Sequence, residues 1–297
     1  MDKIKRRDFL KLGGTAAAGV MTVPHLPPLP VAVPGAPELV VKRVPGSISV
    51  NLNDPMWSRT TPLSVTLKPQ NLTIPMGGRD MMLNVRVAHD GNRIGFLLQW
   101  ESTTKDISVL GHENFRDAVA LQFPLGNGLP FYAMGQKGGA VNIWHWKADW
   151  EEDLKGFKDV EAKYPNMFAD DYPFSKKPAG SIPSASENDK TFLTGWSAGN
   201  ALSDPNRRTS VEELNAEGFG SLTSQSAAKG VSVEGRGAWE GGLWRVAMVR
   251  SLASSDPLDV AFTPGQKTAV AFAVWDGARG DRGGAKSVST WVGLSLE

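Results

Sequence analysis

Alternation of apolar and polar residues along the chain predicts β-strands. Residues 83–87 and 94–100 both alternate with a period of two, and Asp90 and Gly91 between them supply a turn. An Asp-Gly pair between two alternating segments is typical of a β-hairpin. The sequence therefore predicts a hairpin over residues 83–100.

The same alternation recurs in the second half of the chain. A further hairpin is expected where Glu240, Gly241 and Gly242 join two alternating segments. Short strands separated by Gly, Pro, Asn and Asp turns, with little helical periodicity, favour an antiparallel arrangement. We expect a mainly β fold, an antiparallel β-sandwich with a few short helices. The alternating segments are residues 230–239, 243–250, 268–277 and 289–296.

Two segments predict helices. In residues 210–220, Ser210 followed by Glu213 has the spacing of a capping box, so a helix is expected there. A second short helix is expected within residues 149–164. No linker divides residues 38–297, which we interpret as one domain.

The N-terminus carries the pattern of an export signal. Arg6 and Arg7 precede Phe, Leu and Lys, and a mild apolar run rich in Ala and Gly follows. This pattern is typical of the twin-arginine route, and the run is too short and too Gly-rich for a stable membrane span. Residues 1–37 are therefore expected to be a signal peptide with a Pro-rich spacer, and the protein to reach the periplasm. An amphipathic N-terminal helix or a retained anchor is the alternative.

Composition narrows the chemistry. The chain has no cysteine, which excludes disulfides, covalent c-type haem, iron–sulfur clusters and thiolate zinc sites. The net charge of +1 gives no reason to expect a nucleic-acid partner or an anionic membrane surface. Any cofactor must be held by His, Met, Lys, carboxylates or the shape of a cavity.

Residues 112–150 contain the clearest candidate for cofactor chemistry. Met134 lies in a loop rich in Gly and Pro, and a strand with several tryptophans follows. A thioether presented from such a loop beside aromatic side chains suits one axial position of a buried haem iron. The alternative is that Met134 simply fills a gap in the core, as methionine readily does.

Several segments together resemble the haem b (gamma) subunit of ethylbenzene dehydrogenase and its relatives, the dimethylsulfide dehydrogenases and the selenate and chlorate reductases. The resemblance covers FRDAVALQFP, the loop with Met134, VNIWHWKADW, residues 197–223 and the segment GAWEGGLWRVAMVRSL. It implies a sandwich that binds one non-covalent haem b between loops at one end. It also implies that the second axial ligand is a lysine, for which Lys229 in SQSAAKGVSVEG is the candidate.

Other donors compete for the second axial position. His145 lies between Trp144 and Trp146 and should point away from both. Lys147 shares the face of His145 and is the fallback if Lys229 does not bind iron. His112 and His89 are expected to be surface residues.

The walls of the haem slot are predicted from neighbouring side chains. Trp144, Trp146 and Phe131 are the wall candidates, and Asn142 could bond to a haem edge. Packing in an ordinary core is the alternative for each aromatic residue.

The resemblance implies a non-catalytic electron-transfer subunit of a molybdenum oxidoreductase complex. Its expected partners are a molybdopterin catalytic subunit, an iron–sulfur subunit and a periplasmic cytochrome c or similar carrier. A secreted carbohydrate-binding module is the alternative function, because tryptophans on a sandwich also suit sugar stacking. An exposed aromatic platform would favour sugar binding, whereas buried aromatics would favour haem. The polar loop over residues 168–194 is a lid, a partner contact or a disordered insertion.

Overall fold

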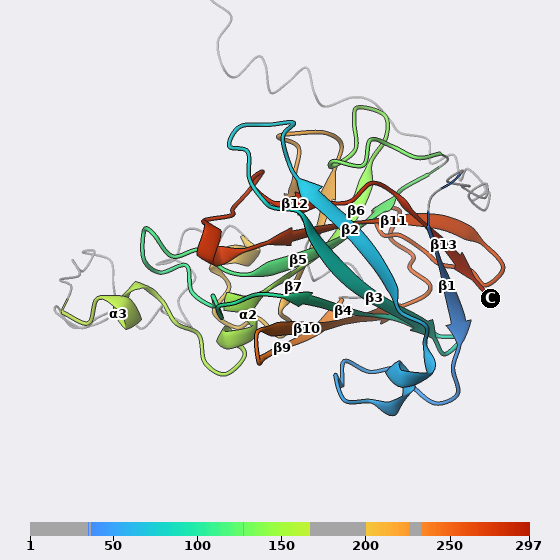
Figure 1. The fold of residues 1–297 in the computed structure, drawn as a ribbon, viewed down its shortest axis with the longest axis horizontal. Helices are drawn as coiled ribbons and strands as arrows, with labels where there is room; N and C mark the ends of the chain where they lie inside the picture. The colour runs from blue at the N-terminus through green and yellow to red at the C-terminus, as the bar shows by residue number, and fades with distance from the viewer. Residues whose placement is uncertain (1–34, 36, 127, 167–199, 226–232) are drawn as a thin grey trace, which may run out of the picture.

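The computed structural model describes residues 35, 37–126, 128–166, 200–225 and 233–297. The two predicted hairpins are confirmed, and strands account for most of the regular structure (Figure 1). The strands are β1 Glu38–Arg43, β2 Leu63–Pro69, β3 Met81–His89, β4 Arg93–Glu101, β5 Ala118–Pro124, β6 Val141–Lys147, β7 Val211–Ala216, β8 Thr223–Ser224, β9 Glu234–Glu240, β10 Leu243–Ser251, β11 Lys267–Trp275, β12 Ser287–Val288 and β13 Val292–Leu296. The helices are η1 Pro55–Arg59, α2 Ala148–Asp153, α3 Val160–Lys163, η2 Ala201–Ser203 and η3 Gly277–Arg279.

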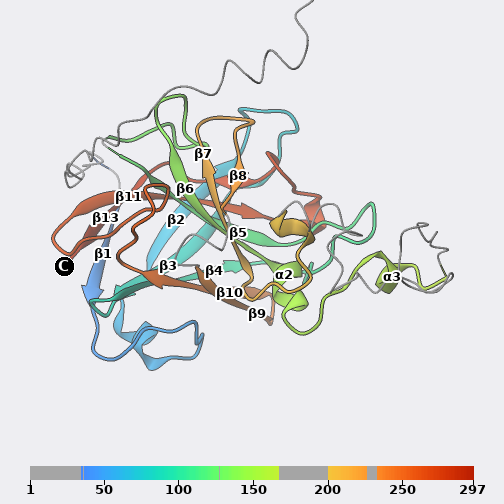
Figure 2. The ribbon, with the colours of Figure 1, turned by 180° about the vertical axis from the view of Figure 1, so that it is seen from behind.

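The strands pair in the order β8-β7-β6-β5-β11-β12-β2-β3-β4-β10-β9 and form two layers that lie face to face (Figures 1 and 2). One layer holds β5 to β8 with β11, and the other holds β2 to β4 with β9 and β10. The main chain also joins the layers through β1, which pairs in parallel with both β13 and β3. All other strand pairs are antiparallel, so the fold is the expected mainly β sandwich apart from the parallel pairing of β1.

The core lies between the two layers and contains most of the large side chains. Phe96 packs against Phe123 and Trp144, with ring centroids 5.8 and 5.9 Å apart. Trp146 meets Trp244 at 5.1 Å. Large rings packed tilted or edge to face at these distances add to the stabilisation that burial of their apolar surface provides.

The predicted helix over residues 210–220 is wrong, because this segment forms strand β7. Every residue from Val211 to Ala216 pairs with β6, and β8 pairs on the other side. Glu213 forms no capping box but accepts a hydrogen bond from buried Arg250 at 2.8 Å. The local capping signal is overridden because pairing of all six residues with β6 stabilises this segment as a strand.

The helix expected within residues 149–164 is confirmed in part. Two shorter helices, α2 and α3, occupy the segment. Gly156 lies between them with φ 151°, a conformation that interrupts a right-handed helix.

The expectation that His89 is a surface residue is also wrong. His89 is the last residue of β3 and only 1% exposed. Its Nε2 lies 2.8 Å from the backbone oxygen of Glu297. The hairpin turn begins one residue later, so His89 is covered by the C-terminal segment. His112, in contrast, is exposed as expected.

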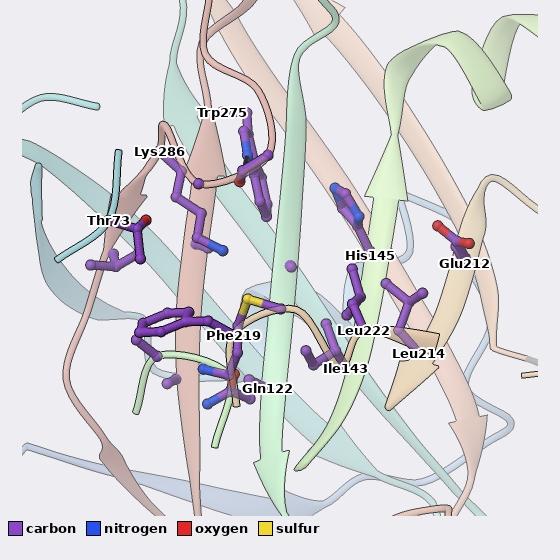
Figure 3. A pocket seen from close by; sticks show the side chains of 18 of the residues that line it. Thr73, Gln122, Ile143, His145, Glu212, Leu214, Phe219, Leu222, Trp275 and Lys286 are labelled. Carbon is purple, nitrogen blue, oxygen red and sulfur yellow. Dashed lines mark hydrogen bonds between the residues drawn. The ribbon is translucent and has the colours of Figure 1, made fainter. Parts of the chain in front are cut away.

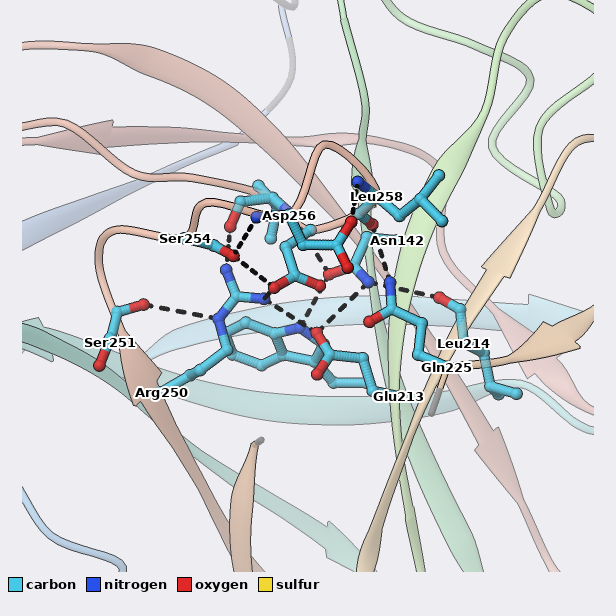
Figure 4. Close-up of polar contacts among 12 residues, drawn as sticks. Asn142, Glu213, Leu214, Gln225, Arg250, Ser251, Ser254, Asp256 and Leu258 are labelled. Atoms are coloured by element: carbon cyan, nitrogen blue, oxygen red, sulfur yellow. Dashed lines mark hydrogen bonds and ion pairs between the residues drawn. The ribbon is translucent and has the colours of Figure 1, made fainter. Parts of the chain in front are cut away.

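A buried polar cluster lies between the layers beside β6 (Figure 4). Arg250 is fully buried, donates to Glu213 and lies 3.8 Å from Asp259. Its guanidinium is 5.0 Å from the ring of Trp144. Two carboxylates therefore share one cation, and burial raises the pKa of Glu213 to about 7.

Candidate functional site

A cavity of about 610 Å³ lies on the outer face of the layer formed by β7, β6, β5 and β11 (Figure 3). Its volume is within the usual range for sites that bind small molecules or cofactors. Segments outside the floor strands also contribute lining residues, which include Thr73 and Ile74, residues 132–134, Leu202, Phe219 with Gly220 and Leu222, and Gly283 with Gly284 and Lys286. The cavity is thus separated from the core by one layer of sheet.

Small side chains form much of the floor of the cavity. Ala120 on β5 and Ala271 and Ala273 on β11 all line it. Side chains of a strand alternate between the two faces, so intervening residues such as Val270 and Val274 belong to the core instead. The alanines leave a shallow apolar surface on which a flat ligand could lie.

Met134 lines the cavity from the loop between β5 and β6. Its φ is 68°, and it is the only non-glycine residue with positive φ in the part of the chain that the structure describes. The left-handed region is unfavourable for side chains with a Cβ, so the surrounding contacts must hold it. Its carbonyl accepts a hydrogen bond from the backbone N–H of Gly218 at 2.8 Å.

Gln122 fixes the same loop from the floor. Its Oε1 accepts a hydrogen bond from the backbone N–H of Met134 at 3.0 Å, and its Nε2 donates to the carbonyl of Tyr132 at 2.8 Å. Gln122 is largely buried on β5. One amide therefore clamps the backbone on both sides of Ala133 and sets where the thioether of Met134 lies.

Lys286 lines the cavity from the loop before β12. Among the described residues, its Nζ has no hydrogen bond or ion pair, and its closest recorded partner is the ring of Trp275 at 4.8 Å. Burial lowers the pKa of Lys286 to about 8. Lowering the pKa from 10.5 to about 8 reduces the free energy needed to deprotonate the amine by roughly 3 kcal/mol.

His145 lines the cavity from β6, and Trp275 lies between it and Lys286 (Figure 3). The rings of His145 and Trp275 stack with centroids 4.5 Å apart. Nε2 of His145 is buried and has no hydrogen-bond partner. Burial, followed by the charges of Lys147, Arg116 and Lys286, holds the pKa of His145 well below its usual range, so the ring is neutral near pH 7.

Lys147 is committed to an ion pair. It bonds to Glu212 on the neighbouring strand β7 and lies 4.1 Å from the ring centroid of Trp150. Burial lowers the pKa of Lys147 to about 8, against the opposing effect of Glu212. Its amine is therefore less available as a ligand than that of Lys286.

Three of the predicted site residues lie on the other face of β6. Trp144 and Trp146 are fully buried in the core, and neither lines the cavity. Asn142 accepts a hydrogen bond from Nε1 of Trp144 at 3.0 Å and belongs to the polar cluster of Arg250. The strand follows the predicted alternation, which directs His145 and Lys147 to the cavity and the tryptophans away from it.

The remaining predicted residues have different outcomes. Phe131 is 38% exposed and does not line the cavity. Its ring centroid lies 6.4 Å from that of Phe219, which does line the cavity. Lys229 lies outside the described residues. Of the two favoured ligands, Met134 is thus found at the cavity, and the two competing donors His145 and Lys147 line it as well.

The sequence reasoning missed Lys286 and Gln122. Lys286 follows GDRGGA between two predicted strands, so it occupies a glycine-rich loop of the same kind as that of Met134. That likeness could have identified it. Gln122 carried no signal, because a polar residue in an apolar strand does not reveal which loop covers it.

The aromatic residues bear on the alternative of a sugar-binding platform. Among the described tryptophans, all are buried except Trp239, which is partly buried. The described part of the chain therefore lacks an exposed tryptophan platform. It also contains no helix long and apolar enough to cross a membrane.

Three known proteins are similar to this chain in sequence. A respiratory nitrate reductase heme subunit, ORF7, of Haloferax mediterranei is 28% identical over 70% of this chain and 54% of its own length. Dimethylsulfide dehydrogenase subunit gamma of Rhodovulum sulfidophilum is 28% identical over 85% of this chain and 78% of its length. Chlorate reductase subunit gamma of Ideonella dechloratans is 29% identical over 40% of this chain and 52% of its length. The chain thus spans about half the length of the first and third of these relatives.

Solved structures give weaker likenesses. A carbohydrate-binding protein from Bacteroides uniformis aligns over 88% of this chain and 100% of its own, with 10% identity and a TM-score of 0.43. A family 9 carbohydrate-binding module from Caldicellulosiruptor kristjanssonii aligns over 88% of this chain and 95% of its own, with 7% identity and a TM-score of 0.38. Likenesses of this extent carry no conclusion about function.

The family model described as ethylbenzene dehydrogenase matches residues 54–287, which include every strand that forms the cavity floor together with Met134 and Lys286. The chain belongs to the ethylbenzene dehydrogenase family.

Proposed function

We propose that this chain is the haem b electron-transfer subunit of a molybdenum oxidoreductase complex. We further propose that the cavity holds one non-covalent haem b, which the thioether of Met134 and the neutral amine of Lys286 would bind through its iron. One observation carries the proposal: Met134 and Lys286 line the same cavity, above a floor of alanines, and the Lys286 amine has no polar partner among the described residues. The chain has no cysteine that could bind a cofactor in their place.

The lining residues fit such a cofactor in shape and polarity. Ala120, Ala271 and Ala273 offer a shallow floor, and Phe219 and Leu222 offer apolar walls. A thioether is an established haem ligand, and a neutral amine has the lone pair that iron requires. When bound, haem b supplies a centre that accepts and gives up single electrons.

The chain's own residues prepare the two ligands. Gln122 and Gly218 hold the backbone of Met134 in its left-handed conformation. Burial of Lys286 favours the neutral form of its amine, and Trp275 packs against it. Both ligands are therefore positioned by contacts that do not depend on the cofactor.

Three other donors remain as alternatives for the second position. His145 lines the cavity, although Trp275 lies between it and Lys286. Lys147 is paired with Glu212. Lys229, the candidate from the sequence, lies outside the described residues. We favour Lys286 because its amine lines the cavity without a polar partner.

Axial substitutions test the proposal in the purified chain. The wild type should contain pigment that acid–acetone extracts, with a six-coordinate low-spin spectrum. Met134→Ala and Lys286→Ala should each open a coordination position that binds carbon monoxide readily. Lys286→Met should instead raise the reduction potential, because two thioethers favour ferrous iron.

Matched substitutions separate the possible ligands. His145→Ala, Lys147→Ala and Lys229→Ala should keep a six-coordinate spectrum. If Lys229→Ala opens the iron and Lys286→Ala does not, the second ligand is Lys229. A colourless wild type in an assembled complex would contradict haem binding altogether.

The named relatives support the wider assignment. Two are gamma subunits of a dehydrogenase and a reductase, and the third is a heme subunit of a nitrate reductase. By analogy, this chain would catalyse no reaction itself. It would relay electrons between an iron–sulfur subunit, next to a molybdopterin subunit, and a periplasmic cytochrome c or similar carrier. Co-purification of the full chain with two such subunits tests the assembly.

A further inference from the structure

The charges that line the cavity are unbalanced. Arg116 and Lys147 are cationic, whereas Glu212 is the one anionic side chain among the described lining residues; Lys286 adds a further positive charge only while it is protonated. Glu212 is satisfied by Lys147 and by the hydroxyl of Ser224. The cavity therefore has an excess of positive charge that favours an anionic ligand.

Four polar residues gather at one end of the cavity: Arg116, His145, Lys147 and Glu212. Along β6 the outward residues change from Val141 and Ile143 to His145 and Lys147. Ala118 of β5 pairs with Lys147, so Arg116, two residues earlier in the chain, reaches the same end. In Figure 3, His145 and Glu212 lie on the side of the cavity away from Thr73 and Phe219. The β6 end of the cavity thus carries Arg116 and Lys147, whereas Lys286 lies on the side of Thr73 (Figure 3).

Arg116 has hydrogen-bonding capacity to spare. Its Nη1 bonds to Asp149 at 2.8 Å, and Asp149 does not line the cavity. A guanidinium has five N–H donors, and no second partner is recorded for Arg116 among the described residues. Its side chain is 24% exposed, so further donors are available to a ligand.

His145 presents a second unmet group at the same end. Nε2 is buried without a partner, and the ring is fixed by stacking on Trp275 at 4.5 Å. A buried polar atom without a hydrogen bond is destabilising and calls for an explanation, such as a ligand that supplies the partner. A neutral imidazole can donate one N–H to a carboxylate.

Haem b carries two propionate carboxylates on one edge and apolar substituents on the other. We propose that Arg116 and His145 bind these propionates, so that the haem enters with its carboxylate edge at the β6 end near Lys147 and its apolar edge beneath Ile74 and Phe219. This inference rests on the proposed function, because it assigns the orientation of the same cofactor in the same cavity.

The test compares two ligands on the haem-free full chain. Ferric protohaem and its dimethyl ester, in which both carboxylates are neutralised, are titrated separately and their dissociation constants are measured from the Soret absorption. Wild type should bind protohaem at least about tenfold more tightly, since a hydrogen bond to a charged group contributes roughly 1.5 kcal/mol or more. Arg116→Gln and His145→Phe should each reduce this preference, and His145→Phe keeps a ring to stack on Trp275.

Arg93→Gln is the matched control. Arg93 has a similar exposure of 26% and a single ion pair, with Glu234 at 2.7 Å, but does not line the cavity. Its substitution should leave the preference at the wild-type value. Equal wild-type affinity for the two ligands would overturn the inference and leave haem binding intact. A wild type that binds neither ligand would overturn the proposed function as well.

Discussion

At the scale of single residues, the account depends on how Met134 is held. A residue with a Cβ at φ 68° does not keep that conformation by itself. Two hydrogen bonds provide the restraint: the backbone N–H of Met134 donates to Gln122, and the carbonyl of Met134 accepts from the backbone N–H of Gly218. The position of the thioether is therefore a property of the loop and the strand beneath it together.

Gln122→Leu should loosen the loop that holds Met134 without changing Met134 itself. Two hydrogen bonds of about 1 kcal/mol each are lost, and the Met134 backbone is free to relax. We expect a partly high-spin spectrum and tighter binding of carbon monoxide than in the wild type. Gln136→Leu, in the same loop, should change the spectrum less. A fully low-spin Gln122→Leu variant would show that Gln122 does not position the ligand.

Glu213 should make stability depend on pH. Its pKa rises from 4.5 to about 7 on folding, because burial disfavours the carboxylate. Between these values the folded chain holds a proton that the unfolded chain has released, so this stabilisation is full below pH 4.5 and is lost as the pH rises through 7. The free energy of unfolding should fall by an amount on the order of 3 kcal/mol over this window.

Glu213→Gln cannot titrate, so its stability should vary less between pH 4.5 and 7. Urea unfolding at several pH values measures the difference. Glu234→Gln, at an exposed carboxylate on β9, is the control and should follow the wild-type curve. Parallel curves for Glu213→Gln and the wild type would show that the cluster with Arg250 does not bind the proton.

At the scale of elements, alternation along β6 and β11 separates core from cavity. Ala273→Phe adds a ring to the floor and should block haem uptake while the haem-free chain remains folded. Trp144→Phe removes a core contact and the bond to Asn142, and should lower the free energy of unfolding by about 1–3 kcal/mol. Its haem spectrum should not change. Haem content is measured from the absorption spectrum, and circular dichroism checks that Ala273→Phe is folded. If the folded Ala273→Phe variant still binds haem, the cofactor lies elsewhere.

Much of the fold was accessible from the sequence because period-two patterns are local. The hairpins β3–β4 and β9–β10 follow directly from alternation and turn residues. The strand β7 was not accessible, because its pairing with β6 outweighs the capping signal at Ser210. Met134 was found from its loop, whereas Lys286 becomes a candidate only when the fold brings its loop over the same floor.

At the scale of the whole molecule, we propose that residues 1–37 direct export and that residues 38–297 form the haem domain. The twin-arginine pair at Arg6 and Arg7 gives the test. Replacing both with Lys should retain the precursor in the cytoplasm, because lysine does not reproduce the fork of guanidinium donors. Cell fractionation measures this. Normal periplasmic accumulation of the double variant would indicate the general secretory route or carriage by a partner.

The most direct test of the central claim is the position of the iron. Crystals of the haem-loaded chain, measured at the iron absorption edge, give an anomalous peak that needs no assumption about ligands. The account predicts one peak in the cavity between Sδ of Met134 and Nζ of Lys286. An iron peak beside His145 or Lys229 as the coordinating residue, or a peak outside the cavity, would contradict the account.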